Sequence, residues 1–188
     1  LVDIDEKSLQ EEGQWPWSRD VLAEYIDKIP DNNLIAINIL FSEKDRLGGD
    51  ESLAKSISKK PTILSTQVTD NLEKKTDLHV GSVTLGPTDA PVVIKNYNGI
   101  LAPIPILLNN ASGYGALTSS PSIDGVVREM PLIISSDKKV YPSFALEILR
   151  VAVGDKSYQI KTNDLGIEWV RIPVYKPIQT NNDGSIYN

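Results

Sequence analysis

Apolar residues recur at helical spacing between residues 18 and 29, and this pattern predicts an amphipathic helix. Ser18 is a residue type that caps the start of helices, and Pro30 cannot continue one. The predicted apolar face consists of Val21, Leu22, Tyr25, Ile26 and Ile29. We therefore expect this helix to pack one side against a hydrophobic core.

The segments around this helix have the character of strands. Residues 34–41 form a nearly continuous apolar run rich in β-branched side chains, which is typical of a strand buried on both faces. Residues 1–4 have the pattern of the end of an earlier strand. Asp50 can cap a short helix, and residues 61–64 then begin another buried strand. This alternation of strand and helix predicts parallel strands joined by right-handed crossovers.

The rest of the chain is less regular, apart from one strong helix that begins at Ser143 and stops at Gly154. A short helix is also expected at residues 103–110. Short strands are expected at residues 83–85, 92–94, 115–117, 126–128, 132–134, 158–160 and 169–174. We predict an α/β fold of one domain over residues 1–188, with a mixed, largely parallel β-sheet flanked by helices on both faces.

Composition excludes several classes of function. The chain has 19 basic and 25 acidic residues, a net charge of −6, which argues against binding to nucleic acid or anionic lipid. The absence of cysteine excludes thiol catalysis, thiolate metal sites and disulfides. The single histidine, His79, lies in a polar stretch expected to be a solvated loop, so neither a catalytic triad nor a histidine zinc site is expected. The chain begins with Leu1 instead of methionine, and we therefore expect it to be a piece of a longer protein.

Acidic residues follow two of the predicted strands. Asp3 and Asp5 come after the first, and Glu43 and Asp45 come after the second. Loops at the carboxyl ends of parallel strands line the ligand crevice of an open α/β sheet, so these carboxylates are expected to face one another. They are candidates for binding a hard cation or a cationic ligand. Ordinary solvated loops have the same composition, so a metal site remains one of two interpretations.

Trp15 and Trp17 flank a proline immediately before the predicted helix. Two large aromatic side chains can form a binding platform for a ring or a cation, and they can equally plug the base of a sheet. Arg19, in the first helical turn, opposes the helix dipole, which predicts a carboxylate partner such as Asp3 or Asp5.

Several blocks of the sequence resemble the class-two CHASE domains, which are extracellular sensors associated with cyclases and histidine kinases. The first blocks are Asp3-x-Asp5-Glu6-x-Ser8-Leu9 and Gly13-x-Trp15-Pro16-Trp17-x-Arg19. Further blocks follow in family order at Ile39-Leu40-Phe41-x-Glu43-x-Asp45, Asp50-x-x-Leu53-Ala54, Asp124-Gly125-Val126-Val127-Arg128-x-x-Pro131-Leu132 and Tyr141-Pro142-Ser143-Phe144-Ala145-Leu146. Together they run from residue 3 to about residue 154 and are specific as a set.

The resemblance implies the extracytoplasmic sensory domain of a bacterial inner or plasma membrane receptor. In the full-length protein, transmembrane helices would flank the domain, and a class III adenylate or guanylate cyclase inside the cell would be the output. It implies no cofactor and no catalysis by this chain, and a small molecule or ion of unknown identity as the stimulus. A homodimer is one assembly that it leaves open.

Three other interpretations remain open at this stage. The output module could be a histidine or Ser/Thr kinase. The chain could be a carboxylate- and metal-dependent hydrolase that uses the acidic loops, or a structural spacer. For the sensor, the candidate ligand-binding residues are Asp3, Asp5, Trp15, Trp17, Arg19, Glu43 and Asp45, with Asp124 and Arg128 added from the later predicted hairpin.

Overall fold

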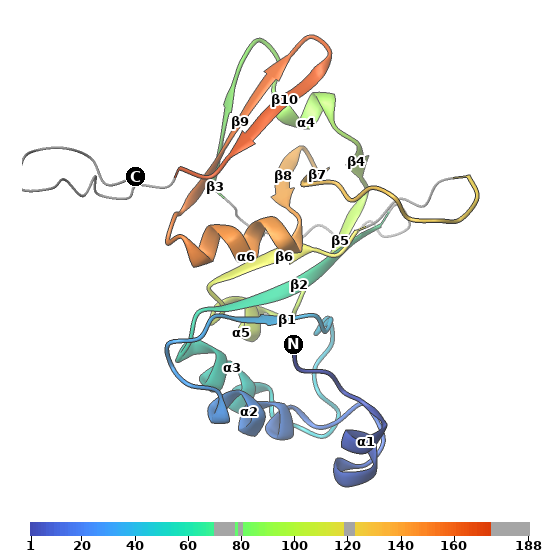
Figure 1. Ribbon diagram of the computed structural model, residues 1–188, viewed down its shortest axis with the longest axis vertical. Coiled ribbons are helices and arrows are strands. Elements are labelled where there is room, and N and C mark those ends of the chain that lie inside the picture. Colours follow the sequence, from blue (N-terminus) through green and yellow to red (C-terminus); the bar gives the residue numbers. More distant parts are fainter. Residues whose placement is uncertain (70–77, 79–80, 119–122, 174–188) are drawn as a thin grey trace, which may run out of the picture.

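The computed structural model describes residues 1–69, 78, 81–118 and 123–173 (Figure 1). The helices are α1 (Glu6–Glu12), α2 (Arg19–Lys28), α3 (Asp50–Ser58), α4 (Ala90–Val93), α5 (Pro105–Leu108) and α6 (Phe144–Ala152). The strands are β1 (Ile35–Ile37), β2 (Thr62–Thr69), β3 (Gly81–Leu85), β4 (Asn96–Tyr97), β5 (Gly99–Leu101), β6 (Gly113–Ala116), β7 (Ile133–Ser136), β8 (Lys139–Pro142), β9 (Ser157–Asn163) and β10 (Gly166–Arg171). The predicted α/β class is confirmed, and the strands divide among three mixed sheets.

Strand β2 is the centre of the largest sheet. It pairs in parallel with β1 and with β6, and in antiparallel orientation with β5. The parallel β1–β2 pair, joined through α3, is the crossover that the sequence pattern predicts. Most of β2 is buried, as expected for a strand covered on both faces.

Helices cover both faces of this sheet (Figure 1). Helices α2, α3 and α5 lie on one face, where Leu53, Ile57, Leu64 and Leu107 are fully buried in a common core. Helix α6 packs against β2 and β6 on the opposite face. The apolar stripes of α2 and α3 account for their positions, because each helix buries that stripe against the sheet.

The two smaller sheets stand beyond α6, on the side away from α2 and α3 (Figure 1). One contains β3, β9 and β10, and the other contains β4, β7 and β8. Helix α4 contacts both sheets, and Ala90, Ile133, Val140 and Ile160 form the core between them. A further core that includes Tyr97, Ile100 and Tyr141 joins the β4–β7–β8 sheet to the central one.

Four local predictions are wrong. Of residues 34–41, predicted as a strand buried on both faces, only Ile35–Ile37 form a strand, β1, which lies at the end of the strand order and is only partly buried. Residues 1–4 form no strand and lead into α1, whose start is capped by the side chain of Asp5. Residues 92–94 were expected as a strand, but Pro91 lies in the first turn of α4, where proline is favoured because no N–H is required. Residues 126–128 form no strand either, and the observed hairpin is β7–β8.

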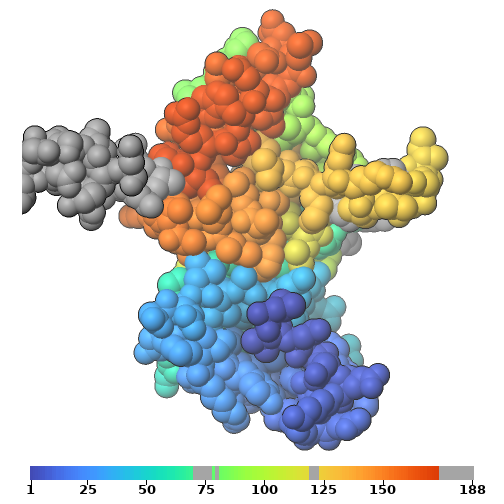
Figure 2. Space-filling view, in the orientation of Figure 1, coloured from blue at the N-terminus to red at the C-terminus, as the bar shows by residue number. Residues whose placement is uncertain are grey.

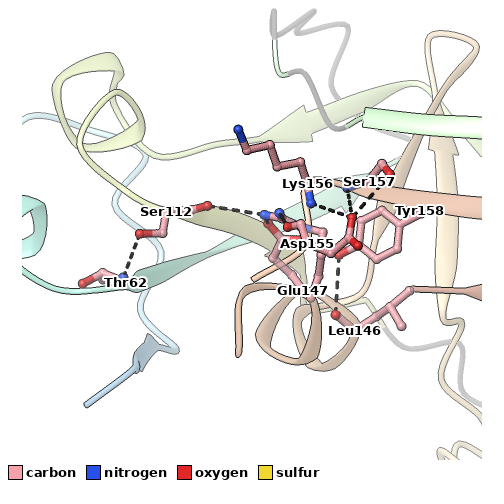
Figure 3. Close-up of polar contacts among 9 residues, drawn as sticks. Thr62, Ser112, Leu146, Glu147, Asp155, Lys156, Ser157 and Tyr158 are labelled. Atoms are coloured by element: carbon pink, nitrogen blue, oxygen red, sulfur yellow. Dashed lines mark hydrogen bonds and ion pairs between the residues drawn. The ribbon is translucent and has the colours of Figure 1, made fainter. Parts of the chain in front are cut away.

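A buried polar network joins α6 to β9 (Figure 3). Glu147 is 1% exposed, and its carboxylate accepts hydrogen bonds from Nε of Arg150 at 2.9 Å and from Nη2 at 2.6 Å. The hydroxyl of Tyr158 donates to the same carboxylate. Gly113 of β6 lies so close that a Cβ atom there would overlap Glu147, which explains glycine at that position.

This network predicts how stability depends on alkaline pH. Burial, followed by the nearby Glu147 charge, raises the pKa of Tyr158 above its ordinary value of about 10. The folded chain therefore retains a proton that the unfolded chain loses, and the free energy of unfolding should fall as the pH rises above about 10. Tyr158→Phe should flatten this decline in urea unfolding measured between about pH 9 and 11. Equal declines in wild type and Tyr158→Phe would contradict the prediction.

Candidate functional site

A groove of about 690 Å³ lies between the segment that precedes α2 and the segment that follows β1. Its volume falls in the range of roughly 300–1,000 Å³ that is usual for small-molecule sites. The lining residues are Trp15, Pro16, Trp17, Arg19, Leu22 and residues 39–47. The groove therefore brings together five of the residues proposed from the sequence, namely Trp15, Trp17, Arg19, Glu43 and Asp45.

Arg19 connects the two walls of the groove through hydrogen bonds. It is the first residue of α2 and is 7% exposed. Its Nη1 donates to the Asp50 carboxylate, its Nη2 donates to the Glu43 carbonyl, and its backbone N–H donates to Asp45 Oδ2 at 2.7 Å. Its guanidinium also lies 5.0 Å from the centroid of the Phe41 ring, a cation–π distance.

The loop opposite α2 is shaped by two of these carboxylates. Asp45 Oδ1 accepts a hydrogen bond from the backbone N–H of Leu47 at 3.1 Å, and the Asp50 carboxylate accepts one from the N–H of Asp45 at 3.3 Å. Gly49 has a φ of 92°, and a Cβ atom there would overlap the backbone of Asp20. The loop therefore packs directly on the first turn of α2.

The predicted partners of Arg19 were wrong. Asp3 is exposed, and Asp5 caps α1, accepting hydrogen bonds from Ser8 N at 2.9 Å and Ser8 Oγ at 2.7 Å. These bonds to Ser8 lower the pKa of Asp5. The prediction failed because it placed both carboxylates at the end of a strand that does not form. The pairing of Asp50 with Arg19 was not predicted either, because Asp50 was interpreted only as the cap of a short helix.

Aromatic rings form one side of the groove and continue along α2. The Trp15 and Trp17 rings meet edge to face with centroids 5.8 Å apart, and Trp17 stacks on Tyr25 at 6.1 Å. Nε1 of Trp17 donates to the Gly13 carbonyl at 2.7 Å, and the Tyr25 hydroxyl donates to Glu12 at 2.6 Å. The three rings and these two hydrogen bonds therefore connect α1 to α2. Trp15 is the last ring of the series and is 40% exposed.

Two basic side chains in the groove were not singled out from the sequence. Lys44 and Arg46 are both exposed, and neither has an ion pair or hydrogen bond to another residue that the structure describes. The carboxylate of Glu43 and Nε1 of Trp15 likewise have no partner within the described part of the chain. Alternating charges over residues 43–46 were the only signal in the sequence.

Asp124 and Arg128 lie elsewhere. Arg128 donates to both carboxylate oxygens of Asp124, at 2.9 and 2.7 Å, and the Arg128 partner lowers the pKa of Asp124. This exposed ion pair belongs to residues 123–132, which project from the body of the molecule, away from α1 and α2 (Figure 2). The structure does not bring these two residues to the groove.

The four acidic residues proposed as a cation site do not form a cluster. Within residues 1–69, 78, 81–118 and 123–173, no three histidine, cysteine or acidic side chains come together in an arrangement that could hold a metal ion. Asp3, Asp5, Glu43 and Asp45 all belong to this part of the chain. His79 lies outside the described residues.

Comparison with family models decides the family. The CHASE2 domain model matches residues 1–187. The chain belongs to the CHASE2 domain family. CHASE2 domains are sensory domains of signalling receptors, generally extracellular, and they are not catalytic. Comparison with curated proteins and with solved structures gives no significant match. None of the helices described in this CHASE2 domain has the length and apolarity needed to cross a bilayer.

The contacts of Arg19 predict that it stabilises the CHASE2 domain. Arg19→Ala would leave the Asp50 carboxylate without its cation in a largely buried site, and should lower the free energy of unfolding by about 3 kcal/mol. Arg19→Lys should lower the free energy of unfolding by less, because lysine keeps the positive charge but lacks the planar set of donors. Urea unfolding measures both effects. Lys59→Ala is the control, because its exposed ion pair with Asp27 is worth no more than about 1 kcal/mol. Equal losses for Arg19→Ala and Lys59→Ala would refute the assignment.

Proposed function

We propose that this CHASE2 domain is the stimulus-binding part of a bacterial membrane receptor, that it lies outside the cytoplasm, and that its stimulus binds in the groove. The observation that carries this proposal is the combination of an accessible aromatic wall with polar groups that have no partner among the described residues. Binding sites of small molecules typically combine apolar lining with a few polar groups that fix orientation.

A ligand in this groove would contact both of its walls. Trp15 and Trp17 belong to the segment that enters α2, whereas residues 39–47 follow β1. A molecule held between them favours the arrangement of α2 and the loop that it fits best. Binding can shift the receptor between two states only by its difference in affinity for them, and contact with two separate elements is a direct source of such a difference.

We further propose a class III adenylate or guanylate cyclase as the output inside the cell, reached through transmembrane helices that flank the domain. Membership of the CHASE2 family and the resemblance to sensors of cyclases support this choice. A histidine or Ser/Thr kinase is the alternative output and would use the same input site. The hydrolase alternative has no set of metal-binding side chains among the described residues.

The 188-residue chain contains no cysteine, so each thiol introduced into it is the only one within the domain. In the full-length receptor, Lys44→Cys places a thiol in the groove, and Lys161→Cys places one on β9, in an exposed ion pair with Glu168. Both are labelled with a bulky, membrane-impermeant maleimide in cells from which any outer membrane has been removed, and production of cyclic AMP and cyclic GMP is measured. Labelling at position 44 should change that production by roughly twofold or more, because the label occupies the groove and shifts the population of states. Labelling at position 161 should leave it unchanged.

Each proposal has its own contrary outcome in this experiment. Failure of the impermeant reagent to label either thiol until the cells are opened would contradict a location outside the cytoplasm. Efficient labelling at position 44 without a change in output would contradict the groove as the stimulus site. A change in phosphotransfer with no cyclic nucleotide produced would replace the cyclase by a kinase.

A further inference from the structure

The groove has an apolar wall large enough for a ring. The exposed face of Trp15 lies at its edge, and Leu22, Ile39 and Phe41 line it more deeply. Leu47, 71% exposed, stands at its rim. A flat or aliphatic body placed here removes apolar surface from water on both partners, at about 25 cal/mol per Å².

The deeper charged groups of the groove are already engaged with each other. Arg19 donates to Asp50 and to the Glu43 carbonyl, and Asp45 accepts the N–H groups of Arg19 and Leu47. A cationic ligand that used Asp45 or Asp50 would have to displace these bonds. These carboxylates therefore hold the walls of the groove, and the Asp50 charge is already paired with Arg19.

The unpaired groups, by contrast, are mostly donors. Lys44 and Arg46 supply eight N–H groups and two positive charges, and Trp15 supplies one further N–H. Against them stand the carboxylate of Glu43 and the hydroxyl of Ser42, which can donate or accept; neither has a partner among the described residues. The guanidinium of Arg46 also has the fork geometry that matches a carboxylate or phosphate. The unpaired groups at the groove thus sum to one positive charge in a chain whose net charge is −6.

From this we infer that the ligand of the groove is an amphipathic anion, with an aromatic or aliphatic body against Trp15 and a carboxylate, sulfonate or phosphate head at Lys44 and Arg46. This inference deepens the proposed function and rests on it only for the groove's role in signalling. Selection for an anion comes from the head group at Lys44 and Arg46, and it has to exceed the attraction that the Trp15 ring offers to a cation.

A matched pair of probes tests the inference with the 188-residue chain. 2-Naphthoate and 2-naphthylmethylammonium share one ring system and carry opposite charges. Calorimetric titration should give at least about tenfold tighter binding of the naphthoate, which corresponds to about 1.4 kcal/mol. In the double variant Lys44→Ala/Arg46→Ala this preference should fall to within about threefold, because the cationic head-group partners are removed.

A second double variant separates local recognition from overall charge. Lys59→Ala/Lys161→Ala removes the same number of positive charges from exposed sites outside the groove, and should keep the tenfold preference. Loss of the preference in this control as well would show a general electrostatic effect and overturn the inference. Trp15→Ala should weaken both probes by a similar factor, since it removes apolar contact without changing charge.

The other outcomes are also decisive. Equal binding of the two naphthyl probes to the wild-type chain would refute anion selection while leaving the groove as a binding site. Absence of binding by either probe at millimolar concentration, together with an effect of the maleimide label on receptor output, would overturn the ligand class and keep the proposed function. Binding to phosphatidylglycerol vesicles but not to naphthoate would show a lipid-facing surface and would likewise overturn the inference.

Discussion

A guanidinium that is 7% exposed is stable only if its charge and its N–H groups are satisfied inside the protein. Arg19 meets this requirement with the Asp50 carboxylate, the Glu43 carbonyl and the Phe41 ring. These partners belong to α3 and to the segment after β1, whereas Arg19 itself begins α2. The buried charge of Arg19 thus connects the start of α2 to the loop after β1, and the groove lies between these two segments. The arrangement of the groove walls is set by that charge more than by the loop's own turn residues.

The other end of α2 is also held by a buried cation. The side chain of Lys60 is 1% exposed, and its ammonium donates to the carbonyls of Ile26, at 2.7 Å, and of Ile29, at the C-terminal end of the helix. The Ile26 carbonyl also accepts the backbone N–H of Ile29 at 3.1 Å, and the negative end of the helix dipole favours a cation there. Helix α2 is therefore held at its start by its own Arg19 and at its end by Lys60, which lies between α3 and β2, and this makes the helix a firm wall for a binding groove.

The sequence predicts well where local pattern and packing agree. Helices α2, α3 and α6 follow from apolar periodicity with suitable end residues, and the parallel β1–β2 pair follows from their order. Short apolar runs mislead, because a strand at residues 92–94 or 126–128 needs a neighbouring strand that periodicity does not reveal. The groove residues were partly anticipated. The pairing of Arg19 with Asp50 was not anticipated, since 31 positions separate them and local periodicity does not reveal contacts between segments so far apart in the sequence.

The Glu147 network lies on the face of the central sheet opposite to α2, and polar contacts connect it to the start of β2 (Figure 3). Lys60, which is hydrogen-bonded to the end of α2, lies two residues before Thr62. The N–H of Thr62 donates to Ser112 Oγ at 3.3 Å. The Ser112 carbonyl accepts from Arg150 at 3.3 Å, and Arg150 pairs with Glu147. Close-packed interiors transmit displacement instead of absorbing it. A displacement of β2 would therefore be transmitted to α6, which packs on it, and through the hydrogen bond between Tyr158 and Glu147 to β9.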